Sequence, residues 1–258
     1  MNIGLIGAGA IANFLLTEIN QKQMDDLQIK SVFVRDRKKY KSLELKYNAR
    51  LFTDLEAFLA SGIDTVVEAA TIEAVHEHLP TVLKEKDAVL ISIGALADET
   101  FLQKVSNLVE IHKHSLYLPS GAIGGLDLLQ NAHALGTVKE VSLTTRKPAD
   151  SLVDSPINIE EIVFEGKATD AIKQFPKNIN VSIILSLAGI GLDKTKVTII
   201  ADPKTDKNSH HIEVQGDFGT AALTVDNAPL PENPKTSYLA AMAVLGTLKR
   251  IGGRIRIG

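Results

Sequence analysis

Two pairs of residues in this chain have types and spacings that suit enzyme chemistry, one of glycines and one of histidines. Gly7 and Gly9 permit a tight turn and let the backbone approach a phosphate group closely. A histidine titrates near neutral pH, so either His210 or His211 suits the proton transfers that accompany hydride transfer at carbon. The sequence therefore predicts an anion-binding turn and a proton-transfer site.

The glycine pair lies where a predicted strand meets a predicted helix. Residues 3–6 form a short apolar run, and apolar residues recur at helical spacing over residues 11–19. Strand, glycine turn and helix in this order are typical of a dinucleotide-binding unit, with Ala10 and Ile11 beside the pyrophosphate. Ala12 stands where a third glycine is usual and is small enough to keep the helix close to the strand.

The identity of the dinucleotide depends on the end of the next predicted strand, residues 29–34. Arg35 and Asp36 follow that strand directly. An acidic residue there accepts hydrogen bonds from the ribose of NAD, whereas an arginine binds the additional phosphate of NADP. The sequence therefore predicts NAD or NADP and leaves the choice between them open.

Predicted strands alternate with predicted helices as far as residue 119. This alternation is typical of an α/β fold with a Rossmann-type, doubly wound parallel sheet, in which ligands lie beyond the carboxyl ends of the strands. Small residues at three of those ends leave space for a ring system: residues 69–71, which include Ala69 and Ala70, residues 92–95, and residues 120–122.

The pattern changes in the second half of the chain. Alternating polarity predicts strands over residues 138–146, 197–202, 210–216 and 221–227. Together with an apolar helix over residues 180–189, they predict an α+β catalytic domain with a mixed or antiparallel sheet.

Three segments follow from these patterns. Residues 1–119 form a dinucleotide-binding domain, and residues 120–231 form a domain for catalysis, substrate binding and dimerisation. Three prolines in residues 229–234 indicate a linker, so residues 232–258 return to the first domain with a helix over 236–251. We expect a homodimer, because few predicted helices remain to cover the apolar face of the second sheet.

Polar residues beside the predicted helices of the second half are candidates for ligand binding. Asn180 can cap its helix or bond a ligand amide. Thr236 or Ser237 can cap the last helix, but capping does not account for Lys235, which suits an anionic ligand.

The composition narrows the classes of function. The net charge is −3 with both signs interspersed, which argues against nucleic acid and membrane surfaces as partners. Cysteine is absent, which excludes disulfides and thiolate catalysis, and no histidine spacing favours a metal site. Because the first predicted strand begins at residue 2 and no apolar run is long enough to span a bilayer, we expect a soluble, cytoplasmic protein.

Eight motifs spread along nearly the whole chain resemble, in this order, the L-aspartate dehydrogenase family. In one-letter code they are GAGAI (7–11), VEAA (67–70), SIGAL (92–96), PSGAIGG (119–125), FPKNINV (175–181), ADP (201–203), NSH (208–210) and PENPKTS (231–237).

The resemblance implies NAD(P)-dependent oxidative deamination of L-aspartate to oxaloacetate and ammonia through iminoaspartate, which in some members supplies NAD biosynthesis. It implies that His210 is the active-site histidine and that Ala122 and Asn180 contact the nicotinamide. The family usually has an acidic residue after this histidine, where the present chain has His211.

A substrate with two carboxylates needs cationic or hydrogen-bonding groups at both ends. We expect four residues to supply them: Lys147, Asn178, Lys235 and Thr236. His210 is then the general base.

Two other functions suit the same pattern of elements. Enzymes like dihydrodipicolinate reductase share the two-domain plan and a histidine pair, but they carry a lysine and a Ser-Gly-Thr anion loop soon after that pair, which this chain lacks. A dinucleotide-sensing protein would bind the cofactor without turnover, and an assay of cofactor consumption separates it from an enzyme.

Overall fold

The protein divides into two compact units in a computed structural model that describes residues 1–175 and 180–255, apart from the side chain of Lys235. The first unit consists of residues 1–119 and 241–258, and the second of residues 120–240. In this division residues 232–240 lie with the second unit, although the sequence patterns group them with the last helix.

A six-stranded parallel sheet forms the centre of the first unit, in the order β3-β2-β1-β4-β5-β6. The strands are β1 (Asn2–Ile6), β2 (Gln28–Phe33), β3 (Arg50–Phe52), β4 (Thr65–Glu68), β5 (Asp87–Leu90) and β6 (Leu116–Tyr117). Their residues are apolar almost without alternation, because helices cover both faces of the sheet. The strand order reverses at β1, and the carboxyl ends on either side of that point are where such folds bind ligands.

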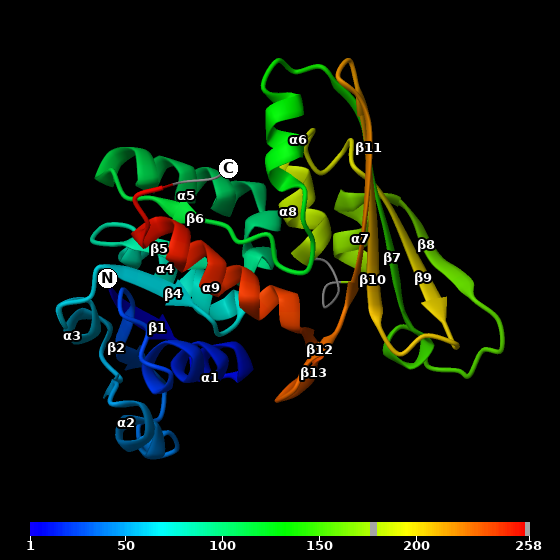
Figure 1. Ribbon diagram of the computed structural model, residues 1–258. Helices are drawn as coiled ribbons and strands as arrows, with labels where there is room; N and C mark the ends of the chain where they lie inside the picture. The colour runs from blue at the N-terminus through cyan, green and yellow to red at the C-terminus, as the bar shows by residue number, and fades with distance from the viewer. Residues whose placement is uncertain (176–179, 256–258) are drawn as a thin grey trace. The chain divides into compact units, whose positions relative to one another are not determined.

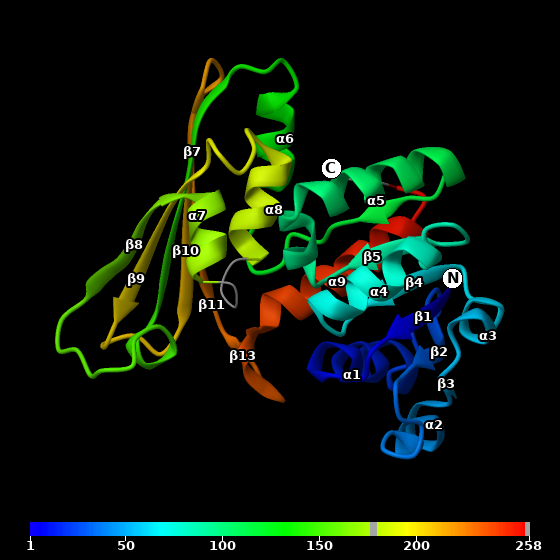
Figure 2. The same ribbon diagram turned by 180° about the vertical axis from the view of Figure 1, so that it is seen from behind.

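The helices of the first unit follow the strands that they connect. They are α1 (Ala10–Leu16), which continues as a π-helix over Thr17–Gln21, α2 (Lys41–Tyr47), α3 (Leu55–Leu59), α4 (Ile72–Val82), α5 (Glu99–His112) and most of α9 (Tyr238–Gly252), with a 3₁₀ turn at Ile93–Ala97. Because crossovers between parallel strands are right-handed, α1 lies on one face of the sheet and α4 and α5 on the other (Figures 1 and 2).

The second unit contains a five-stranded mixed sheet in the order β11-β10-β7-β9-β8. Its strands are β7 (Val138–Pro148), β8 (Glu161–Lys167), β9 (Lys196–Asp202), β10 (Asn208–Gly216) and β11 (Gly219–Asn227). Strands β7 and β9 are parallel and the other pairs are antiparallel. The predicted fold class, a Rossmann-type sheet followed by an α+β domain with a mixed sheet, is confirmed.

One face of this second sheet is apolar and is covered by helices of the same unit: α6 (Leu126–His133), α7 (Ala168–Gln174) and α8 (Asn180–Ala188) (Figure 1). Val141, Leu143, Ile199 and Ile212 on this face are buried. The reason given above for a homodimer is therefore wrong, because the apolar face is covered within the chain.

Two boundaries near the end of the chain also differ from the sequence patterns. The expected linker over residues 229–234 is a small hairpin, in which β12 (Pro229–Leu230) pairs with β13 (Asn233–Ser237). The prolines fit because β13 pairs on one side only, so no ladder hydrogen bond is lost. The last helix consequently begins at Tyr238 rather than at Thr236.

No helix within the described ranges is long and apolar enough to cross a membrane.

Candidate active site

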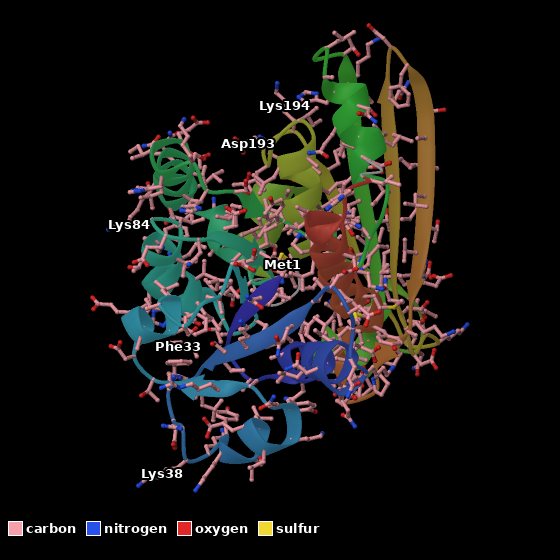
Figure 3. The ribbon with its side chains drawn as sticks, turned by 60° about the vertical axis from the view of Figure 1, so that its left-hand side comes forward. Met1, Phe33, Lys38, Lys84, Asp193 and Lys194 are labelled. Carbon is pink, nitrogen blue, oxygen red and sulfur yellow. The ribbon has the colours of Figure 1, made fainter. Side chains whose placement is uncertain are left out.

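In the first unit, Gly7 ties together the ends of three strands. Its backbone φ is +102°, and a Cβ added there would lie 2.6 Å from the carbonyl oxygen of Ala69, beyond β4. Its N–H donates to the carbonyl of Phe33, the last residue of β2, over 3.0 Å. Phe33 is labelled in Figure 3. Glycine is therefore required at residue 7 by the packing of the chain itself.

Gly9 has a different reason to be glycine. It precedes α1 as its N-cap, it is exposed, and an added Cβ would meet only the Ala69 carbonyl oxygen, at an ordinary 3.9 Å. The side-chain amide of Asn13 holds the turn by donating to the carbonyls of Ala8 and Gly9. Among the described residues, no side chain caps the N–H groups of Ala10 and Ile11. Space above Gly9 and free N–H groups suit the pyrophosphate of a dinucleotide.

Arg35 and Asp36 lie beyond the end of β2, and both are exposed. One carboxylate oxygen of Asp36 accepts from the backbone N–H groups of Lys38 and Lys39, over 2.8 and 3.3 Å. These bonds fix the turn and leave the other oxygen for a ribose hydroxyl. The structure thus keeps both a carboxylate and a guanidinium at the predicted ribose end.

Glu68, the last residue of β4, was not predicted to be a site residue. Its buried carboxylate accepts from the backbone N–H groups of Ala70, Ile91 and Ser92 and from the Ser92 hydroxyl. Burial raises the pKa of Glu68, and these hydrogen bonds oppose that rise. The carboxylate joins the ends of β4 and β5 and so fixes the segment that contains Ala69 and Ala70. The sequence signal that could have identified Glu68 is a charged residue at the end of an apolar strand.

In the second unit, His210 lies on β10 on the helix-covered face of the sheet and is only 4% exposed. It is paired across the strands with Thr145 of β7, and its Nδ1 lies 3.0 Å from the Thr145 hydroxyl oxygen. Burial, and secondly the charge of Lys147, lower the pKa of His210 to about 4. The imidazole is therefore neutral at pH 7, oriented by one hydrogen bond, and able to accept a proton.

His211 points to the opposite face, because successive residues of a strand alternate. Its Nδ1 lies 2.7 Å from the Thr224 hydroxyl, and its Nε2 lies 3.5 Å from a carboxylate oxygen of Glu213. The two histidines are consequently separated by the sheet, and His211 does not share the environment of His210.

Lys147 lies two residues beyond Thr145 on β7, on the same face as His210. Burial lowers the pKa of its ammonium group to about 8. It lines a cavity of about 1180 Å³ at the end of the sheet, together with Asn208, Asn227 and Ser237. A partly buried cation at the wall of a cavity suits a carboxylate ligand.

The other predicted residues of the second unit are distributed as follows. Ala122 is buried, and its carbonyl accepts from the side chain of Asn227. Asn180 is exposed and is the first described residue of α8. Thr236 lies in β13, where its hydroxyl accepts from Asn233 over 3.0 Å. Asn178 and the side chain of Lys235 lie outside the described part of the chain.

Ser237 is the last residue of β13 and immediately precedes α9. Its hydroxyl donates to the side-chain oxygen of Asn227, ten residues earlier in the sequence. The Ser237 hydroxyl is thus engaged with β11, and its role as a cap of the last helix stays a prediction.

Comparisons with known proteins agree over the whole chain. Residues 7–119 match the family model "Homoserine dehydrogenase, NAD binding domain", and residues 127–251 match "Aspartate dehydrogenase, C-terminal". L-aspartate dehydrogenase of Methanosarcina mazei is 39% identical, over 100% of this chain and 99% of that protein. The chain belongs to the L-aspartate dehydrogenase family.

Other members of the L-aspartate dehydrogenase family agree in sequence and in structure. The enzyme of Methanocaldococcus jannaschii is 37% identical over 100% of this chain and 99% of its own length. The crystal structure of aspartate dehydrogenase from Thermotoga maritima superposes with a TM-score of 0.82 at 30% identity, covering 100% of this chain and 99% of that one. The resemblance noted from the sequence motifs is thereby confirmed.

Proposed function

We propose that this protein is an NAD(P)-dependent L-aspartate dehydrogenase with His210 as its general base. The observation that carries the proposal is the neutral, buried His210, held by Thr145 in the same unit as the cavity that contains Lys147. Family membership supports aspartate as the substrate and favours this function over a dihydrodipicolinate-type reductase or a sensor.

The reaction balances in two steps. L-Aspartate loses a hydride and a proton to give iminoaspartate, and water then adds to the imine so that ammonia leaves and oxaloacetate remains. The nicotinamide ring, when bound, accepts the hydride or returns it in the reverse direction. His210 accepts the proton of the amine or of the attacking water, which is a role for its unprotonated nitrogen.

The residues of the first unit fit the dinucleotide at three places. Gly7, Gly9, Ala10 and Ile11 surround the pyrophosphate, supported by the exposed turn and the free N–H groups of α1. Arg35 and Asp36 bind the adenosine ribose. Ala69 and Ala70 border the cofactor, fixed by Glu68.

In the second unit, Ala122 and Asn180 contact the nicotinamide, and the two carboxylates of the substrate are held by Lys147, Asn178, Lys235 and Thr236. The support is strongest for Lys147, because its partly buried ammonium borders the cavity. A bound dicarboxylate brings negative charge next to Lys147 and His210. That charge raises the pKa of both groups, so His210 becomes a stronger base when the substrate is present.

The test is an absorbance assay at 340 nm with oxaloacetate, ammonium and either NADH or NADPH. The proposal requires consumption of the reduced cofactor that depends on both oxaloacetate and ammonium. Binding of the cofactor without consumption would support the sensor instead.

We further propose that the protein is a cytoplasmic homodimer in which the uncovered face of the second sheet is the contact. No helix of the described second unit lies over this face, and Ile162 on it is 62% exposed beside its cross-strand partner Ile200. Sedimentation at micromolar concentration should give twice the chain mass of 27.8 kDa, and Ile162→Glu should shift the population toward the monomer. A wild-type monomer under these conditions contradicts the dimer.

A further inference from the structure

The side chain of Asn227 forms hydrogen bonds with Ala122 and with Ser237, in two separate segments of the second unit. The proposed reaction gives Asn227 no role. Asn227 ends β11 and is 4% exposed. Its Nδ2 donates to the carbonyl oxygen of Ala122 over 3.1 Å, and its Oδ1 accepts from the hydroxyl of Ser237. Both ends of a buried amide are thus used, across 105 and 10 residues of sequence.

The two joined segments lie next to the two points where the chain passes from one unit to the other. Ala122 follows the passage at residues 119–120, and Ser237 precedes the passage at residues 240–241. Asn227 and Ser237 also line the cavity that contains Lys147. Asn227 therefore contacts both the proposed nicotinamide segment and the proposed substrate cavity.

We propose that Asn227 is a positioning residue that holds the Ala122 carbonyl ready for the carboxamide of the nicotinamide. The inference rests on the proposed function, which assigns the nicotinamide end of the cofactor to Ala122. A carbonyl oxygen has two lone pairs, so Ala122 accepts from Asn227 with one and from the carboxamide NH₂ with the other. The Ser237 hydroxyl donates to Oδ1 and so directs the Asn227 NH₂ toward Ala122.

The proposal separates the nicotinamide end of the cofactor from its ADP end. The ADP end is bound by the first unit, whereas Asn227 acts only on the second. Loss of the Asn227 donor should therefore weaken NADH but leave ADP-ribose, which lacks the nicotinamide, unaffected. A general loss of folding would weaken both.

The decisive variant is Asn227→Asp, which has the same shape but places a carboxylate oxygen against the Ala122 carbonyl. Fluorescence titration should show that the variant binds NADH about tenfold more weakly, which is the usual cost of an unmade buried hydrogen bond. The affinity for ADP-ribose, measured by calorimetry, should stay within about twofold of wild type. The matched control is Asp226→Asn, because Asp226 is the neighbouring residue, is exposed and faces the other side of the sheet. It should change neither affinity.

A second variant, Ser237→Ala, keeps Asn227 but removes the hydroxyl that fixes its orientation. It should also lower the affinity for NADH, but by less than Asn227→Asp does. It carries the test if Asn227→Asp does not fold. In variants that turn over, kcat should fall while the pH at which kcat is half-maximal stays the same, since His210 is untouched.

Unchanged NADH affinity in both variants, or equal weakening of NADH and ADP-ribose, overturns the inference. Both titrations omit the substrate, so a wild-type protein that binds NADH but does not turn over aspartate contradicts the proposed function and leaves this test intact.

Discussion

At pH 7 the imidazole of His210 carries no charge, because burial and the nearby Lys147 lower its pKa to about 4. The alanine variant of this residue should lower kcat by at least about 100-fold, the lower range for loss of a general base. Cofactor affinity should stay nearly unchanged, as measured by NADH titration, because His210 is not among the residues proposed to contact the cofactor and its hydrogen bond is to Thr145.

His211→Ala is the matched control for His210→Ala. Its side chain lies on the opposite face of the sheet and contacts Thr224, so kcat should stay within about twofold of wild type. Loss of activity in His211→Ala together with an active His210→Ala would show that the base has been placed one residue too early.

Lys147 gives a second prediction at the scale of single residues. Its pKa of about 8 means that the ammonium group is charged at pH 7 and mostly neutral at pH 9, so carboxylate binding is lost as the pH rises through 8. In Lys147→Arg the charge persists at both pH values. The ratio of kcat/KM for aspartate, variant over wild type, should therefore increase about tenfold from pH 7 to pH 9.

That ratio cancels the titration of the substrate amine, which is common to both proteins. A ratio that is constant with pH would show that the charge of Lys147 does not hold the substrate.

At the scale of elements, we expect the residues that follow strand β2 to determine the choice between NADH and NADPH. Arg35→Ala should weaken NADPH about tenfold more than NADH, because only NADPH offers a phosphate to the guanidinium. Arg37→Ala is the control, since Arg37 belongs to the same turn but pairs with Glu44 over 3.0 Å. Equal losses of both cofactors in Arg35→Ala would show that Arg35 does not contact the 2′ position.

An element was predictable from the sequence where the signal for it lies within its own residues. The strands and helices of residues 1–119 followed from apolar runs and glycine turns, which are local signals. The hairpin of β12 and β13 was mistaken for a linker because proline density indicates a break, whereas an edge strand tolerates proline. Helix α6 was not predicted either. It is preceded by Gly125, whose backbone φ is +73°.

The candidate site was less predictable than the elements that hold it. The contact between Thr145 and His210 spans 65 residues and depends on the register of β7 against β10. The contact between Asn227 and Ala122 spans 105 residues. Local periodicity predicts the face of the sheet on which a side chain lies, but not its partner on another strand. For this reason neither Thr145 nor Asn227 was predicted to be a site residue.

For the whole molecule, the buried His210 makes stability depend on pH. Its pKa is about 4 in the folded protein and 6.5 as an unperturbed group, so the folded state disfavours the charged form. The stability that this residue contributes is complete above pH 6.5 and is lost as the pH falls from 6.5 to 4, by about 3 kcal/mol in total.

Urea unfolding at pH 7 and at pH 4.5 measures this loss. His210→Gln cannot gain the proton, so its free energy of unfolding should fall less over this interval than that of wild type. Equal falls in the two proteins would show that His210 is protonated as readily in the folded state as in the unfolded one.

The division of the chain into two units also sets the order in which they are completed during translation. Strands β1 to β6 leave the ribosome first, then the whole of the second unit, and only then the segment that completes the first unit. Ala241, Val244 and Leu248 of that segment are almost fully buried, so the surface that they cover stays open while some 120 residues are being translated. A chain terminated anywhere before residue 241 therefore exposes apolar surface on its nucleotide-binding half, which marks an unfinished product for a chaperone or protease before it can compete for cofactor.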